Sequence, residues 1–297
     1  MGEHLTHYGE RVSDIPHWYS AALAQHPEVV SLEVEGTSIR YRAWGPKGAP
    51  VVVLVHGGAA HGGWWDHIGP HLAAEHRVLA IDLSGHGDSG RRKSYDLETW
   101  AREVVAVADA ESDEPPVVYG HSMGGFVALT AARDHGERLR GAVAIDSPVH
   151  KISPESSARS DRRVDEKPRH YPDRETILGR FRTLPEDDVQ LHYVVRHVAE
   201  GSVIEDSEGW RWKFDPRVFV NSMMEPEDLR GAACDVALLR GERGMATIDI
   251  TETVRERLGG TVPVTVIPDA GHHIMLDQPV ALIAALQTLL GQWRPTR

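Results

Sequence analysis

The run "PVVVLVHGG" at residues 50–58 constrains the fold more than any other stretch of the chain. From residue 51 to 55 it is continuously apolar and rich in β-branched valine, without alternating polar positions. A strand of this kind is buried on both faces, which is typical of the centre of a parallel sheet covered by helices on each side. The run therefore predicts an α/β fold.

Short apolar runs and longer helical patterns alternate around this strand, from about residue 29 to 150. Two strands, 29–36 and 39–45, are expected to form a hairpin at the sheet edge. Further strands are expected at 77–83, 116–120 and 141–146, and helices at 65–75, 96–110 and 125–136. Strand and helix repeated with short connections predict right-handed crossovers and a mostly parallel, twisted sheet with helices on both faces.

The rhythm breaks after Asp146, and residues 148–228 are interpreted as an insertion. A loop is expected over 153–175, an amphipathic helix over 186–200, and an aromatic strand over 209–216. The α/β pattern then resumes with strands at 235–241 and 263–268 and helices at 249–258 and 279–293. The expected division is a core in two parts, 1–147 and 229–297, separated by the insertion 148–228.

Composition and charge exclude several classes of function. The net charge is −12 and no block of Lys and Arg is visible, which argues against a nucleic-acid partner. The single cysteine, Cys234, cannot form an intrachain disulfide and fits a reducing compartment. No apolar stretch has the length of a signal peptide core or a membrane span. We therefore expect a cytoplasmic protein that does not bind membranes and acts on a small molecule, with a homodimer left open.

The motif "GHSMG" at residues 120–124 lies where a predicted strand passes directly into a predicted helix. Such a turn tolerates only small flanking residues, which accounts for Gly120 and Gly124. It places Ser122 at the carboxyl edge of the sheet and at a helix N-terminus, where negative charge is stabilised. We expect Ser122 to be an acyl-transfer nucleophile.

A serine nucleophile needs a base and donors for the oxyanion. The loop "VIPDAGHHIMLDQP" follows the last predicted strand, so His272 is expected at the same sheet edge as the base, with His273 in a structural role. The oxyanion donors are expected to be the backbone N–H of Met123 and that of Gly58, in the glycine-rich loop "HGGAAHGGWWD".

These motifs resemble the α/β-hydrolase fold superfamily. The matching residues are "HGG" at 56–58, "DLSGHGDSG" at 82–90, "GHSMGG" at 120–125 and "GHHIMLDQP" at 271–279. The resemblance implies a serine triad, and we expect neither a cofactor nor a metal.

The triad acid departs from the family pattern. Members commonly carry an aspartate in a G-x-x-D pattern after the strand that here reads "DVALLRG", yet Gly244 stands at that position. Some members place the acid after the strand that follows the nucleophile's helix, and there this chain has Asp146. We predict that Asp146 hydrogen-bonds His272. The alternatives are an Asp146 that only caps or turns the loop into the insertion, with Glu242 or Asp249 as the acid.

By the same resemblance, the insertion is expected to be a cap over the active-site edge. Trp210, Trp212 and Phe214 alternate along one expected strand and, with Trp64, are candidates for the substrate pocket; the competing interpretation is packing. An aromatic pocket would favour an apolar or mid-sized ester.

The sequence thus predicts a hydrolase that cleaves a carboxylic ester or a lactone through an acyl-enzyme. Serine at position 122 disfavours epoxide hydrolases and haloalkane dehalogenases, whose members use aspartate there. Three alternatives stay open: a C–C bond hydrolase of the meta-cleavage type, a cofactor-free perhydrolase, and a ligand-binding receptor that retains the triad.

Overall fold

A mostly parallel eight-stranded sheet forms the centre of the computed structural model, which describes residues 15–153, 166–187, 189–229 and 231–293. The strands are β1 (Glu28–Val34), β2 (Thr37–Trp44), β3 (Val51–Val55), β4 (Arg77–Asp82), β5 (Val117–His121), β6 (Gly141–Ile145), β9 (Asp235–Gly241) and β10 (Val264–Ile267). Their order is β1-β2-β4-β3-β5-β6-β9-β10. Strand β2 runs antiparallel to β1 and β4, and the other neighbours are parallel. The predicted fold class and edge hairpin are confirmed.

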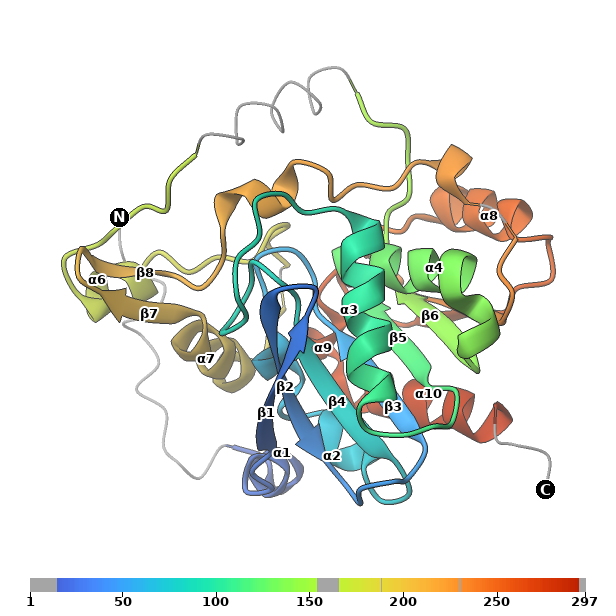
Figure 1. Ribbon diagram of the computed structural model, residues 1–297, viewed down its shortest axis with the longest axis horizontal. Coiled ribbons are helices and arrows are strands. Elements are labelled where there is room, and N and C mark those ends of the chain that lie inside the picture. The colour runs from blue at the N-terminus through green and yellow to red at the C-terminus, as the bar shows by residue number, and fades with distance from the viewer. Residues whose placement is uncertain (1–14, 154–165, 188, 230, 294–297) are drawn as a thin grey trace.

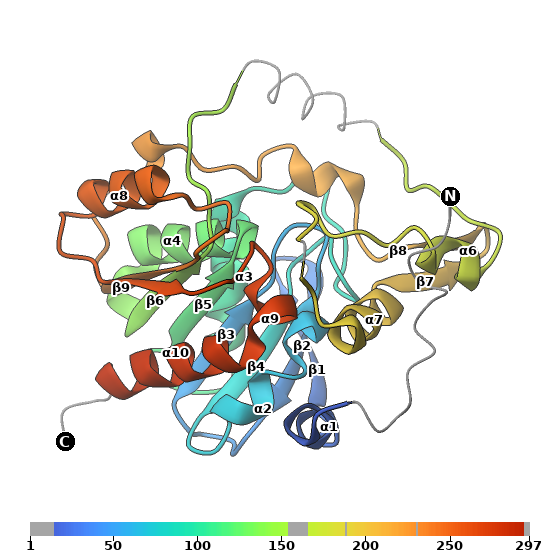
Figure 2. The same ribbon diagram turned by 180° about the vertical axis from the view of Figure 1, so that it is seen from behind.

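Helices cover both faces of this sheet (Figures 1 and 2). One face carries α3 (Leu97–Asp109), α4 (Met123–His135) and α8 (Ile248–Arg257), and the other carries α1 (His17–Leu23), α2 (Gly69–Leu72), α9 (Ile274–Asp277) and α10 (Pro279–Gln292). The helix expected over 65–75 is instead a 3-10 turn, Gly62–Trp65, followed by the short α2. Pro70 explains the break, because proline lacks the N–H that a continuous helix would bond to the carbonyl of Asp66 and is tolerated only in the first turn of a helix.

Strand β3 shows why the sheet needs both layers. Val51, Val53 and Val55 pack into the core beneath α3 and α4, whereas Val52 and Leu54 pack into the core on the α10 side. All five side chains are buried, and burying one such side chain contributes roughly 1.5–3 kcal/mol. The pleat sends successive residues to opposite faces, so a continuously apolar strand is stable only between two helical layers.

Residues 148–228 are here called the inserted segment, and the described residues of this segment lie outside the large sheet. Their described elements are α6 (Arg174–Leu178), α7 (His192–Gly201) and a separate antiparallel pair, β7 (Val203–Asp206) with β8 (Gly209–Trp212). In Figure 1 these four elements lie together to one side of the sheet. Residues 154–165 of the expected loop fall outside the described residues.

Two expected elements of the inserted segment are shorter than predicted. The helix expected from residue 186 begins only at His192, because Leu191 donates its backbone N–H to Leu276 and ties the preceding residues to the core. The aromatic strand ends at Trp212, and Phe214 pairs with His86 of the core through an isolated bridge. In both cases a contact with the core, which the local sequence pattern does not encode, shortens the element.

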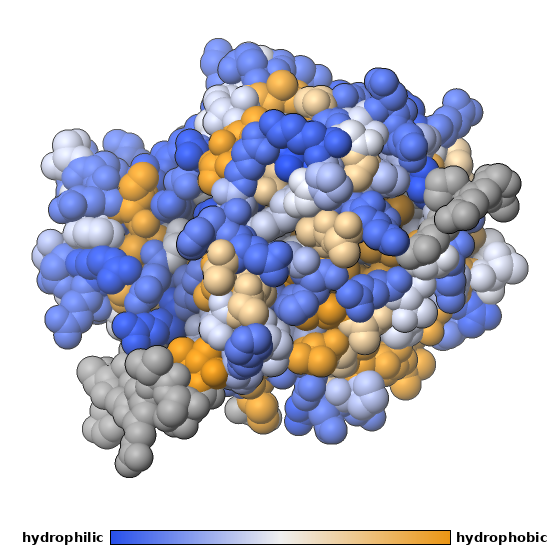
Figure 3. Space-filling model, turned by 90° about the horizontal axis from the view of Figure 1, so that it is seen from below, coloured by the Kyte–Doolittle hydropathy of each residue, from blue (hydrophilic) through white to orange (hydrophobic). Residues whose placement is uncertain are grey.

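On the face seen in Figure 3, small apolar patches lie among hydrophilic side chains. Among the described residues, no helix combines the length and the hydropathy needed to cross a bilayer.

Candidate active site

The three residues nominated as a triad meet at the carboxyl edge of the sheet. Ser122 directly follows β5, Asp146 directly follows β6, and His272 lies in the loop between β10 and α9. Because parallel strands end at the same edge, three segments distant in sequence converge there.

The turn at Ser122 is strained in the way that the sequence indicates. Ser122 has φ 54° and ψ −119°, a region that residues other than glycine rarely adopt. A methyl group at Gly120 would overlap the carbonyl of Gly124, and one at Gly124 would lie 2.5 Å from the carbonyl oxygens of Val55 and His56. Both glycines are therefore needed for the abrupt passage from β5 into α4.

His272 bridges the serine and the aspartate. Its Nδ1 lies 2.6 Å from Asp146 Oδ2, and its Nε2 lies 3.0 Å from Ser122 Oγ. A carboxylate only accepts hydrogen bonds, so Nδ1 carries the proton and donates it. In the neutral ring Nε2 is then an acceptor, and the Ser122 hydroxyl donates to it. His272 and Asp146 are almost entirely buried, at 3% and 0% side-chain exposure.

Asp146 is held by the loop that follows β9. Its Oδ1 accepts from the Gly241 N–H at 3.1 Å, and its Oδ2 accepts from the Met245 N–H at 2.8 Å. The backbone of Asp146 is itself unusual, with φ 45°. A Cβ at Gly244 would overlap this carboxylate. The glycine at the family's usual acid position thus leaves the space that the acid from β6 fills.

The two reserve acids lie elsewhere. Glu242 is exposed and accepts from the backbone N–H of Asp269 at 2.9 Å. Asp249 is exposed in the first turn of α8.

His121 is a site residue that the sequence analysis missed. Its Nε2 lies 2.9 Å from the backbone carbonyl of His272, to which it donates. Complete burial, reinforced by the neighbouring His272 and His273, holds the pKa of His121 well below its usual value, so the ring stays neutral. The second position of "GHSMG" could have drawn attention to it, because that residue ends β5 beside the nucleophile.

The two expected oxyanion donors come from neighbouring segments. Gly58 follows β3, Met123 begins α4, and a Cβ on Gly58 would lie 3.8 Å from the Met123 sulfur. Within the described part of the chain, neither backbone N–H donates a hydrogen bond. Two free amides beside Ser122 are what an oxyanion site requires.

The aromatic candidates separate into two groups. The Trp64 ring centroid lies 5.8 Å from that of His273 and 6.4 Å from that of Phe181, which in turn lies 6.1 Å from Trp212. These four rings form a row from the loop at residues 268–273, between β10 and α9 and here called the catalytic loop, into the inserted segment. Trp210 instead pairs through its backbone with Tyr171 at the rim of the β7–β8 pair.

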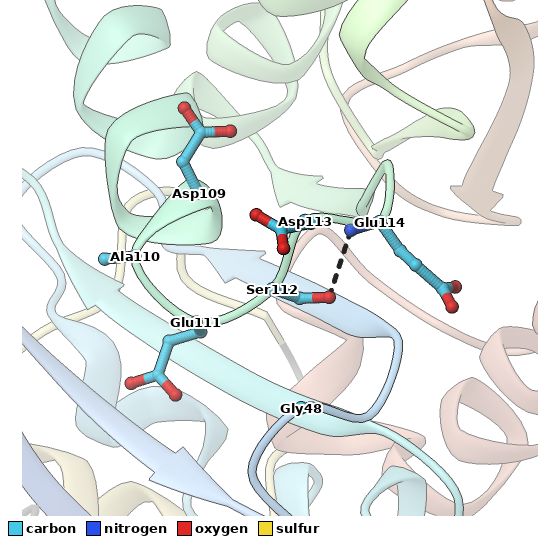
Figure 4. Close-up of a pocket in the computed structure, with 7 residues that line it drawn as sticks. All are labelled: Gly48, Asp109, Ala110, Glu111, Ser112, Asp113 and Glu114. Atoms are coloured by element: carbon cyan, nitrogen blue, oxygen red, sulfur yellow. Dashed lines mark hydrogen bonds between the residues drawn. The ribbon is translucent and has the colours of Figure 1, made fainter.

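A surface hollow of about 460 Å³ lies away from the triad. It is lined by Gly48, which precedes β3, by Asp109 at the end of α3 and by residues 110–114 after it, so it lies near the opposite edge of the sheet. Figure 4 shows its carboxylates pointing in different directions, with Ser112 accepting from the Glu114 N–H at 3.1 Å. In the described ranges, no group of three or more His, Cys, Asp or Glu side chains is placed to hold a metal ion.

Comparisons with known proteins agree with this fold. Residues 52–286 match a family model described as the alpha/beta hydrolase family. An esterase of Mycobacterium tuberculosis is 26% identical over 273 residues, which are 89% of this chain and 89% of that protein.

Epoxide hydrolase B of the same organism is 38% identical over 123 residues, which cover 39% of this chain and 35% of that protein. The solved structure of E-2-(acetamidomethylene)succinate hydrolase superposes with a TM-score of 0.76 at 20% identity, covering 90% of this chain and 100% of that one. With its eight-stranded sheet and the matched span from β3 to α10, this chain belongs to the alpha/beta hydrolase family.

Proposed function

We propose that the protein is a serine hydrolase that cleaves a carboxylic ester or a lactone through an acyl-enzyme on Ser122. The observation that carries the proposal is the continuous hydrogen-bonded chain from Asp146 through His272 to the Ser122 hydroxyl. The similarity to an esterase over most of both chains supports the same class of substrate. A serine at the turn between β5 and α4 supports acyl transfer over epoxide opening.

In the proposed reaction, Ser122 Oγ attacks the substrate carbonyl carbon while His272 Nε2 accepts the hydroxyl proton. The carbonyl oxygen becomes an oxyanion, to which the amides of Gly58 and Met123 donate. The bond to the alcohol then breaks, and His272 returns the proton to the departing oxygen. Water attacks the acyl-enzyme by the same proton transfers and releases the acid. Asp146 fixes the histidine tautomer and stabilises the imidazolium.

The substrate pocket is proposed to lie between the catalytic loop and the inserted segment, which then acts as a cap. Trp64 and Trp212, joined through Phe181, would form an apolar wall for the acyl or alcohol group. Trp210 would contribute at the rim. Aromatic walls of this kind favour an apolar or mid-sized ester over a highly charged substrate.

The first experiment tests the nucleophile. Because Ser122 Oγ forms the covalent bond, Ser122→Ala should lose roughly three or more orders of magnitude in turnover of p-nitrophenyl acetate. A fluorophosphonate should add its mass to the peptide containing "GHSMGG", and Ser112→Ala, which changes a half-buried serine in the loop after α3, should behave as wild type. Labelling of another serine with Ser122 unmodified would refute the assignment.

A panel of esters, lactones, peracid-forming acids and meta-cleavage diketones separates the possible reactions of the same triad. Turnover of esters or lactones with a burst of product is the expected result. Activity on the diketone alone would identify a C–C bond hydrolase, peracid formation would identify a perhydrolase, and tight binding without turnover would identify a receptor.

A further inference from the structure

Three successive backbone N–H groups of the catalytic loop are held by two carboxylates. Gly271 donates to Asp277 Oδ2 at 2.5 Å, and Asp277 belongs to α9, only six residues further along the chain. His272 donates to Asp187 Oδ1 at 3.1 Å, and His273 donates to Asp187 Oδ2 at 3.1 Å. Asp187 comes from the inserted segment and is therefore the distant partner.

The Asp187 carboxylate is built into this contact. Its Oδ2 also accepts from His273 Nδ1 at 2.8 Å, so one side chain receives three hydrogen bonds from two adjacent residues. Only 9% of the Asp187 side chain is exposed. A Cβ at Gly271 would overlap the Asp187 carboxylate, so the catalytic loop has a glycine where the acid approaches.

The charge of Asp187 suits this arrangement. Burial opposes its ionisation, but the hydrogen bonds from the His273 ring and from the two amides outweigh burial and lower the pKa of Asp187 to about 2. Burial lowers the pKa of His273, so that ring is neutral and donates through Nδ1. An ionised acceptor strengthens each of the three hydrogen bonds.

We propose that Asp187 is a positioning residue through which the inserted segment holds His272 in its working orientation. His272 contacts Ser122 through one nitrogen and Asp146 through the other, so its ring is aligned only while its backbone is fixed. Asp187 fixes that backbone at His272 itself and at the next residue. The alignment of the triad therefore depends on the docking of the inserted segment. This inference rests on the proposed function.

The test compares Asp187→Ala with Glu186→Ala. Glu186 is the preceding residue, and its side chain is 70% exposed, so its removal controls for the loss of a carboxylate from this stretch. Asp187→Ala should lower kcat about tenfold to a hundredfold, as expected for a small misplacement of a catalytic group, with KM changed much less. Glu186→Ala should keep the wild-type kcat. Equal losses in both variants would overturn the proposal.

Two further measurements separate positioning from general instability. Sodium formate, which replaces the missing carboxylate, should restore part of the kcat of Asp187→Ala and leave Glu186→Ala unchanged. Asp187→Asn keeps the shape and one acceptor oxygen, so its kcat should fall between those of wild type and Asp187→Ala. A folded Asp187→Ala with wild-type kcat would overturn the proposal.

A readout without substrate keeps this inference distinct from the proposed function. The low-field proton NMR resonance of the hydrogen bond between His272 Nδ1 and Asp146 should weaken or broaden in Asp187→Ala and persist in Glu186→Ala. If Ser122→Ala retained full activity, the proposed function would fail while this resonance still tested the role of Asp187. An unchanged resonance in Asp187→Ala would refute that role.

Discussion

Gly244 and Asp146 depend on each other because the Asp146 carboxylate occupies the space that a Cβ at position 244 would fill. In the proposed triad the acid comes from the end of β6, and Gly241 and Met245, at the end of β9 and in the loop after it, donate backbone N–H groups to its carboxylate. A triad acid can therefore reach the histidine from a different strand without a change in the histidine loop. The position that loses the acid must then stay small.

Replacement of the acid should be costly in turnover and mild in stability. Asp146→Asn removes the charge that stabilises the His272 imidazolium and favours the wrong tautomer, so kcat should fall by roughly 10⁴-fold, as the same change does in serine proteases. Glu242→Gln and Asp249→Asn should stay near wild type in the same steady-state assay. A large loss in either of those, with Asp146→Asn active, would move the acid to another strand.

The glycine gives a second prediction at the same scale. In Gly244→Ala the new methyl group should displace the flexible carboxylate rather than the backbone, so kcat should drop at least tenfold while the unfolding midpoint changes little. Gly291→Ala is the matched control, because a Cβ there meets no atom within 4 Å. Steady-state kinetics and thermal unfolding of both variants test this. Wild-type kcat in Gly244→Ala would contradict the prediction, because it would show that the Asp146 carboxylate accommodates the methyl group without losing its position.

At the scale of elements, the loop between β10 and α9 assigns different tasks to two adjacent histidines. His272 contacts Ser122 and Asp146, whereas His273 turns to Asp187 of the inserted segment. The sequence alone does not distinguish the roles of these adjacent histidines, whereas their different hydrogen-bond partners do.

Substitution of each histidine should reflect these partners. His272→Ala removes the base and should abolish turnover. His273→Ala removes one of the three hydrogen bonds to Asp187 and should leave much of the turnover. The fluorophosphonate labelling rate of Ser122 measures both effects without a choice of substrate. The reverse order of rates would mean that the pair is misassigned.

Helix α9 adds a group that titrates near neutrality. Burial raises the pKa of Asp277 to about 6, above its value in the unfolded chain. Between about pH 6 and pH 4 the folded protein therefore binds a proton that the unfolded chain does not, so this group's contribution to stability grows as pH falls and is lost as pH rises through 6.

The corresponding measurement is the free energy of unfolding by urea at pH 7 and at pH 5. Wild type should gain stability relative to Asp277→Asn on going to pH 5, because the variant has no carboxyl to protonate. A constant difference between the two proteins would contradict the raised pKa.

Local patterns predicted most of the core and both contacts of His272, with Ser122 and with Asp146, for identifiable reasons. The apolar β3 run indicates burial, and "GHSMG" indicates a single tight turn. Both features depend on residues that are adjacent in the sequence. Asp187 carries no such signal, because its role arises only when the inserted segment docks on a loop 85 residues away. For the same reason the sequence overextended the helix that begins at His192, since its first turn competes with contacts to the core.

For the whole molecule, five buried histidines contribute to the response to acid. Burial lowers the pKa of His56, His61 and His67 to about 4 and holds that of His86 and His121 well below its usual value. Unfolding exposes these rings, which then take up protons below about pH 6.5. Stability from these five groups is thus present at neutral pH and is lost progressively as pH falls toward 4.

Calorimetry should therefore record a falling unfolding temperature from pH 7 to pH 5, with net proton uptake on unfolding at pH 5. The number of protons taken up is measured by recording the unfolding enthalpy in buffers that differ in ionisation enthalpy. His67→Gln, which keeps a donor for the Met275 carbonyl, should flatten the pH dependence. No proton uptake at pH 5 would contradict the neutral state of these histidines.

The order of the strands has a consequence for biosynthesis. The nucleophile and the acid leave the ribosome with β5 and β6, but the base follows only after β10, the strand that closes the sheet beside β9. Long-range parallel pairings of this kind form late, because the chain loses loop-closure entropy before the contacts that offset this loss are made. A nascent chain therefore emerges with its serine and acid segments before it carries a base, and under the proposed function hydrolysis begins only after β10 and the loop that follows it have docked.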